Sequence, residues 1–167
     1  FGVENIQNNT KANKGNTKYY KEPNSKNGIL NYSVINAKAR ELMKEFDVRG
    51  AGELIAGGEL SGGNQQKAVI AREIDRDPEL LIVSQPTRGL DVGAIEYIRK
   101  RIIAERDKGK AVIVVSFELD EILDMSDRIA VIYDGAIQGI LDPAETNKQD
   151  LGILMAGGQL NKEEANV

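Results

Sequence analysis

The sequence predicts an α/β fold with a mostly parallel β-sheet. Three apolar runs have the length and composition of strands in such a sheet, at residues 80–83, 111–115 and 128–133. Between these runs, residues 93–108 and a shorter segment near 119–123 carry apolar side chains at helical spacing. Alternating strands and helices are typical of parallel sheets, because the chain returns to the same edge through a helix. We therefore expect the first two runs to form buried strands.

Composition limits the class of protein. The chain has 167 residues, 41% of them hydrophobic, which suits one domain of ordinary size. A net charge of −4 gives no electrostatic argument for nucleic acid as a partner. The absence of cysteine and histidine excludes disulfides and imidazole chemistry from any site built by this chain. No apolar run reaches the roughly 18 residues of a membrane span, and the first residues do not resemble a secretory signal.

The N-terminal part of the chain predicts a loop followed by a helix. Residues 1–7 have the pattern of a helix end, whereas residues 8–28 are rich in Asn and Lys and predict a mobile surface loop. Tyr19 and Tyr20 raise the alternative of a basic ligand-binding patch, but a charge run is usually only solvated. Residues 33–48 place apolar side chains on one helical face and predict an amphipathic helix.

The octet Leu-Ser-Gly-Gly-Asn-Gln-Gln-Lys at residues 60–67 precedes a second apolar helical run, which we expect to end near residue 75. Ser61 suits the N-cap, because its hydroxyl can accept a hydrogen bond from a backbone N–H of the first turn. The next four residues permit close approach of a ligand or add uncharged hydrogen-bonding groups: Gly62, Gly63, Asn64 and Gln65. A helix N-terminus of this kind favours phosphate, although an ordinary Gly-Gly loop at a surface helix is the alternative.

Capping and turn residues delimit the later elements. Asp91 can cap the helix at 93–108, and Gly109 stands where a C-terminal cap belongs. Asp134-Gly135 predicts a hairpin turn that leads to a further strand near 136–140. The Asp-Pro dipeptide at 142–143 suits the start of a last helix, because Asp can cap a helix and Pro suits the first helical position.

These motifs resemble those of ABC-transporter ATPases. The octet at 60–67 resembles the signature motif of that family, usually written LSGGQ, in the form found in importers of simple sugars and nucleosides. The segment Thr-Arg-Gly-Leu-Asp-Val-Gly-Ala at 87–94 supports the same subfamily. Within it, three residues match the D-loop, which lies at the dimer interface of family members: Gly89, Leu90 and Asp91. The alternative for Asp91 is a helix cap alone, and both roles can hold together.

Three residues in two motifs depart from the family pattern. The run at 80–83 matches the Walker B strand, but Ser84 and Gln85 stand where the family has Asp-Glu. The first acid of that pair holds Mg²⁺ and the second orients or deprotonates the attacking water, which a hydroxyl and a carboxamide cannot do. Phe117 stands at the switch position, where the family usually has a histidine that contacts the γ-phosphate. We therefore expect this half-site to have no intact catalytic residues and no metal ligands.

The phosphate-binding loop of the family is absent from the sequence. The only Gly-Lys pair is Gly109-Lys110, and Ala104 stands where the motif requires an earlier glycine. The resemblance therefore implies a partial P-loop NTPase core of ABC type, the C-terminal part of the second nucleotide-binding domain of a fused double ATPase. We expect the parent protein to continue upstream.

The resemblance also implies a division of the chain into three parts. Residues 1–76 would form a helical subdomain that carries the loop at 8–28 and the signature motif. Residues 77–158 would form the C-terminal part of the RecA-like ATPase core. Residues 159–167 would form a flexible tail, because they are polar and terminal.

The resemblance implies that the parent hydrolyses ATP with Mg²⁺ and drives import of a simple sugar or nucleoside. This chain would supply its signature motif to the ATP site of another ATP-binding domain in a head-to-tail pair, and alone it is expected to be inactive. Further partners would be membrane permease subunits and, indirectly, a solute-binding protein, with no nucleic acid. The protein would lie peripherally on the cytoplasmic side of the cell membrane.

Two other functions remain as alternatives. The first is a non-catalytic dimerisation or regulatory module of ABC ATPase type, in which the motifs only hold an interface. The second is an ABC-type ATPase of DNA maintenance. Members of that group carry long coiled-coil insertions before the signature, and residues 8–28 contain no heptads.

Overall fold

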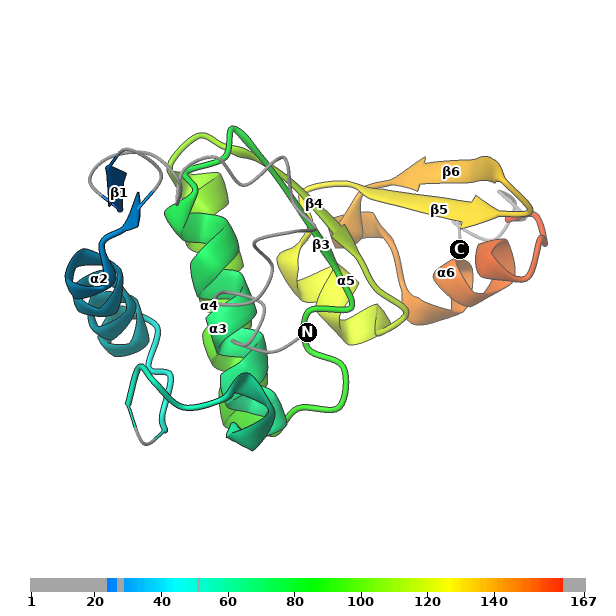
Figure 1. Cartoon of the computed structure of the whole chain (residues 1–167). Helices are drawn as coiled ribbons and strands as arrows, with labels where there is room; N and C mark the ends of the chain where they lie inside the picture. Colours follow the sequence, from blue (N-terminus) through cyan, green and yellow to red (C-terminus); the bar gives the residue numbers. More distant parts are fainter. Residues whose placement is uncertain (1–23, 27–28, 51, 161–167) are drawn as a thin grey trace. The chain divides into compact units, whose positions relative to one another are not determined.

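The structure, a computed structural model, describes residues 24–26, 29–50 and 52–160 of the chain (Figure 1). Contacts divide these residues into two compact units. The first unit contains the described residues up to Leu81 together with Pro86–Val112, and the second contains Ile82–Gln85 and the described residues from Ile113 onward. Among the described residues, no helix combines the length and the apolar character that crossing a membrane requires.

Several sequence-based predictions lie outside the described residues. They are the helix end at 1–7, the greater part of the loop at 8–28 with Tyr19 and Tyr20, and most of the tail. The described end of the predicted loop differs from the expectation, because Ser25–Lys26 (β1) pairs antiparallel with Ile29–Leu30 (β2). The three-part division at residues 76 and 158 stays a prediction.

Three helices make up most of the first unit, and α3 packs against both α2 and α4 (Figure 1). The elements of this unit that follow the β1–β2 hairpin are α2 (Tyr32–Glu45), the 3-10 turn η2 (Gly57–Glu59), α3 (Gly62–Asp75) and α4 (Val92–Asp107). The side chains that fill its interior are mainly aliphatic: Phe46, Ile70, Ala71, Ile74, Ile98 and Ile102. All three helices expected in this region are confirmed.

The predicted amphipathic helix ends earlier than its apolar pattern suggests. It begins after Asn31, whose Oδ1 accepts a hydrogen bond from the N–H of Val34, and ends at Phe46. Asp47 then takes a left-handed backbone conformation, with φ of 48°. A residue in that conformation cannot continue a right-handed helix, so the chain turns sharply here.

Two strands pair at the predicted positions, β3 (Leu80–Ser84) and β4 (Ala111–Val115). Their direction is parallel, because the N–H of Ala111 bonds the carbonyl of Glu79 and the N–H of Gln85 bonds that of Val115. The expectation that both strands are buried is wrong. Every second residue is exposed on one face, and Ile82 and Val115 are 62% and 49% exposed. An apolar run does not reveal how many faces of a strand are covered.

The second unit is built around an antiparallel hairpin. Its elements are α5 (Leu119–Met125), β5 (Ile129–Tyr133), β6 (Ala136–Leu141), the 3-10 turn η3 (Pro143–Glu145) and α6 (Lys148–Met155). Asp134 and Gly135 both have positive φ, at 47° and 74°, which confirms the predicted hairpin turn. The unit's core comes from one face of β5 and one side of α6: Ile129, Val131, Leu151 and Leu154.

The hairpin corrects the predicted sheet. Among the described strands only the β3–β4 pair is parallel, whereas β1–β2 and β5–β6 are antiparallel. The expectation of a mostly parallel sheet is therefore wrong for the described residues. The expected last helix also begins later than the Asp-Pro dipeptide. Asp142 caps η3, and α6 begins after Asn147, whose Oδ1 accepts hydrogen bonds from two backbone N–H groups.

A buried carboxylate ties the end of α4 to the residues before β4. Glu105 is 2% exposed and accepts hydrogen bonds from Lys108 Nζ and Lys110 Nζ, each at 2.6 Å. Lys110 also bonds Asp77 at 2.6 Å. Burial raises the pKa of Glu105, but the hydrogen bonds from the two lysines outweigh it and hold that pKa below its usual range.

We expect acid to destabilise the chain through this carboxylate. Because the folded pKa of Glu105 lies below the unfolded value, the folded state binds fewer protons. This contribution is present above the unfolded pKa, near 4.5, and disappears as the pH falls through the lower folded pKa. Replacing Glu105 with Gln should lower the free energy of unfolding by about 1.5 kcal/mol at pH 7. Urea unfolding from pH 7 to pH 3 should show that difference narrowing, with the exposed Glu59→Gln as control. A constant difference would contradict the assignment.

Candidate functional site

The start of α3 carries the signature-like octet. Ser61 occupies the N-cap position with an extended backbone and an exposed side chain, as the sequence predicts. Its hydroxyl, however, caps no backbone N–H, so the predicted capping hydrogen bond is wrong. Instead Ser61 Oγ accepts a hydrogen bond from Asn64 Nδ2 at 2.9 Å. Asn64 Oδ1 accepts in turn from the backbone N–H of Arg49 at 2.8 Å. The first-turn N–H groups of α3 are thus not satisfied by the serine.

The two glycines of the octet have different surroundings. A methyl group added at Gly62 would meet no atom within 4 Å, so the backbone at this position faces open space. A methyl group at Gly63 would lie 3.2 Å from Ala94 Cβ and 3.5 Å from Asp91 Oδ2. Gly63 therefore permits the close packing of α3 on the first turn of α4, whereas Gly62 leaves the helix end accessible.

Gln65 directs its side chain back to the chain before the helix. Its Nε2 donates to the carbonyl of Leu60 at 2.8 Å, and its backbone N–H bonds the carbonyl of Ser61 at 2.9 Å. Leu60 itself is buried. Gln65 thus holds the entry into α3, and its predicted contact with nucleotide stays a prediction.

The lysine of the octet is engaged within the unit, which sequence reasoning did not foresee. Lys67 Nζ donates to the carbonyl oxygen of Asp47 at 3.1 Å and to its Oδ2 at 2.9 Å, and it lies 4.7 Å from the centre of the Tyr97 ring. Hydrogen bonds from Lys67 and then Arg49 hold the pKa of Asp47 below its usual range. No local motif marks Asp47, because its role depends on a turn and on a helix twenty residues away.

The D-loop-like segment meets the octet in the same unit. Asp91 Oδ1 accepts from the N–H of Ala94 at 2.9 Å, so the predicted helix cap is confirmed. Gly89 has φ of 72°, and the N–H of Leu90 bonds the carbonyl of Thr87, which is buried. These contacts form a compact turn before α4. The predicted interface role of Gly89, Leu90 and Asp91 stays a prediction.

The three residues that depart from the family pattern all belong to the second unit. Ser84 ends β3 with an exposed side chain, and Gln85 follows with φ of 49°. Phe117 is 72% exposed. A hydroxyl and a carboxamide supply no negative charge for Mg²⁺, and the described residues contain no group of three acidic side chains placed to hold a metal ion. These residues therefore do not fit a Mg²⁺ site of this chain's own.

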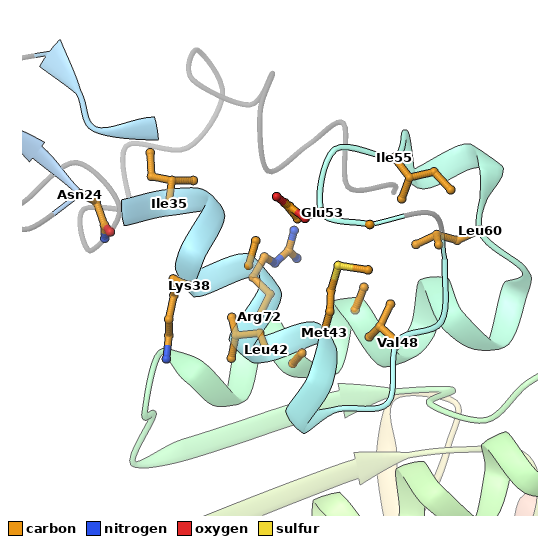
Figure 2. Close-up of a pocket in the computed structure, with 14 residues that line it drawn as sticks. Asn24, Ile35, Lys38, Leu42, Met43, Val48, Glu53, Ile55, Leu60 and Arg72 are labelled. Atoms are coloured by element: carbon orange, nitrogen blue, oxygen red, sulfur yellow. The ribbon is translucent and has the colours of Figure 1, made fainter. Parts of the chain in front are cut away.

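A cavity of about 90 Å³ lies in the first unit between α2, α3 and the segment before η2 (Figure 2). Its lining is mainly apolar and includes Leu60 of the octet. The three charged residues of the lining are engaged in ion pairs: Lys38 with Glu41 and Asp75, Glu53 with Arg40, and Arg72 with Glu73. The cavity therefore contains no unmatched charge that would select a polar ligand.

Comparison with known proteins gives the same class as the motifs. The nucleoside import ATP-binding protein NupA of Lactococcus lactis subsp. cremoris (strain MG1363) is 72% identical over 144 residues, which are 86% of this chain and 28% of NupA. The guanosine import ATP-binding protein NupO of Bacillus subtilis (strain 168) is 58% identical over 139 residues, 83% of this chain and 27% of NupO. No family model matches the chain.

A solved structure supports the fold. The ATP-binding cassette MJ0796, in a dimeric post-hydrolysis state bound to ADP and Pi, matches with a TM-score of 0.60 and 25% identity. The match covers 71% of this chain and 51% of the MJ0796 chain. The fold and the site thus define a partial α/β domain of the ABC cassette class.

Within that class, the chain belongs to the ABC transporter ATP-binding proteins of the nucleoside and sugar import type. It spans slightly more than a quarter of the length of the curated relatives that it matches, 28% of NupA and 27% of NupO.

Proposed function

We propose that this chain is the C-terminal part of the second nucleotide-binding domain of an ABC importer ATPase, and that it completes the ATP site of a partner domain. The observation that carries this proposal is the N-terminus of α3. Ser61 is exposed there, and the backbone at Gly62 faces open space. The Ser61 side chain makes no hydrogen bond to the first-turn N–H groups. A helix end with free N–H groups and a partial positive charge stabilises a phosphate group.

The chain's own residues would act on the γ-phosphate across the interface. The Ser61 hydroxyl and the N–H groups of the first turn of α3 would donate hydrogen bonds to its oxygens as charge develops during hydrolysis. Gly62 would let the triphosphate approach the backbone, and Gln65 would hold the entry into the helix. ATP and Mg²⁺ would be bound mainly by the partner domain, which supplies the phosphate-binding loop and the Walker B acids.

The half-site at the end of β3 would not hydrolyse ATP. Ser84 and Gln85 replace the acidic pair of the family, and Phe117 has no hydrogen-bonding group for a γ-phosphate. The assembly would therefore have one working site and one structural site. The alternative, a non-catalytic dimerisation or regulatory module, would keep the same motifs without any contribution to turnover.

A nucleoside is the favoured solute class. The two relatives with the highest identities described above carry nucleoside and guanosine import in their names, whereas a glucose import relative of Haloferax volcanii is 45% identical. Membrane permease subunits would be direct partners, a solute-binding protein an indirect one, and the protein would lie peripherally on the cytoplasmic side of the membrane. The chain alone is not expected to hydrolyse ATP.

The test is ATPase activity of the full-length protein, assembled with its membrane subunits, after Ser61→Arg. The bulky side chain would fill the phosphate position and remove the hydroxyl donor, so turnover should fall at least 100-fold, on the order of the loss of an oxyanion donor. Ser33→Arg, at an exposed serine of α2, is the matched control and should leave turnover unchanged. Equal turnover of the Ser61→Arg variant and the parent would favour the non-catalytic module.

A further inference from the structure

We propose that Asn64 is a positioning residue, which fixes the Ser61 hydroxyl as a hydrogen-bond donor directed away from the protein. This inference rests on the proposed function and names the group that prepares the serine for the triphosphate. Asn64 occupies the third position of α3 and reaches back to the N-cap, with Nδ2 at 2.9 Å from Ser61 Oγ.

The orientation of the Asn64 amide is determined by its second partner. The backbone N–H of Arg49 lies 2.8 Å from Asn64 Oδ1, and a backbone N–H can only donate. The amide oxygen must therefore face Arg49, which leaves the NH₂ group facing Ser61. A flipped amide would place two donors against each other, so the assignment follows from the network itself.

The orientation of the Asn64 amide determines where the hydroxyl proton of Ser61 can point. A hydroxyl has one proton and two lone pairs, and the NH₂ group of Asn64 occupies one lone pair. The proton cannot point at that NH₂ group, so it remains available to an acceptor outside the unit. Since Ser61 is exposed at the positive end of α3, an anion is the acceptor this arrangement favours.

The anchor for Asn64 is a turn that α3 itself holds. Arg49 follows the left-handed Asp47, and the N–H of Val48 bonds the carbonyl of Met43 at 2.8 Å. Lys67 of α3 bonds Asp47 through both the backbone carbonyl and the side chain. The turn is therefore fastened to the same helix whose N-cap it orients, and no reorganisation is needed when a phosphate arrives.

Asn64→Asp is a sharp test, because it keeps the shape and reverses the hydrogen bond. A carboxylate still accepts from the N–H of Arg49 and is favourable in the first turn of a helix, so folding should not suffer. It cannot donate to Ser61, whose proton would turn inward. In the full-length protein with its membrane subunits, ATPase turnover should fall about 100-fold, whereas thermal unfolding should stay within about 2 °C of the parent. Gln149→Glu, the control, adds the same charge at an exposed first-turn position of α6 outside the octet and should change turnover less than about threefold.

A double-mutant cycle shows whether Asn64 acts through Ser61. Asn64→Ala should lower turnover about tenfold in the parent, which corresponds to the loss of one hydrogen bond to a charged group. In the Ser61→Ala background the same substitution should lower turnover less than twofold. Equal effects in both backgrounds would overturn the inference and leave the proposed function intact. If Ser61→Ala itself leaves turnover unchanged, the proposed function fails first.

Discussion

Replacing Phe46 with alanine is expected to lower the free energy of unfolding by about 3–5 kcal/mol. Phe46 ends α2 and is 1% exposed, so its ring is fully removed from water. The guanidinium of Arg101 on α4 lies 3.9 Å from the ring centre, and Arg101 also bonds Glu45 at 2.6 Å. The truncation removes apolar packing and the surface on which Arg101 rests, and leaves a cavity in the first unit.

The second phenylalanine of the described chain supplies a matched control. Phe117 is 72% exposed, and Phe117→Ala should change the free energy of unfolding by less than about 0.5 kcal/mol. Urea denaturation followed by circular dichroism measures both variants at one pH. Equal losses for the two substitutions would show that burial at Phe46 does not stabilise the first unit.

Gly63→Leu is expected to destabilise the chain by about 3 kcal/mol through overpacking. Its Cβ would lie 3.2 Å from Ala94 Cβ, which is tighter than ordinary contact, and the rest of the leucine must force α3 and α4 apart. Ala94 is buried and belongs to a helix whose cap, Asp91, lies against the same position. The backbone of that turn cannot move without losing the cap.

Two further variants separate crowding from the loss of a glycine. Gly62→Leu places the same side chain at a position where an added Cβ meets no atom within 4 Å. It should change the free energy of unfolding, measured by thermal denaturation, by less than about 0.5 kcal/mol. Combining Ala94→Gly with Gly63→Leu removes the Ala94 methyl group with which the leucine clashes, and should recover part of the lost stability. Absence of any recovery would place the cause elsewhere than at this contact.

Elements marked by local signals could be predicted from the sequence. The hairpin turn at Asp134 and Gly135 and the Asp91 cap follow from residue types whose backbone or side-chain preferences act over two or three residues. The start and end of α4 were predictable for the same reason. Family membership was predictable because its motifs are short and occur in a fixed order along the chain.

Features that depend on distant partners could not be predicted. The sequence suggested that Ser61 caps the backbone, but its hydroxyl accepts from Asn64, whose own orientation is set by Arg49 fifteen residues earlier. The exposed faces of β3 and β4 were missed because apolar composition records the tendency to be buried, not the number of covering layers. The pairing of β5 with β6 was itself predictable from its local turn, and the error lay in expecting parallel pairs to outnumber antiparallel ones.

The ion pair between Lys67 and Asp47 affects how the octet's affinity for a triphosphate would depend on ionic strength. Lys67, the only positive side chain of the octet, is paired with Asp47. Under the proposed function, the octet would therefore bind a triphosphate through neutral hydroxyl and amide dipoles. Dipoles at contact distance are screened by dissolved salt far less than a lysine or arginine clamp. The signature side of the interface should therefore keep its affinity in concentrated salt.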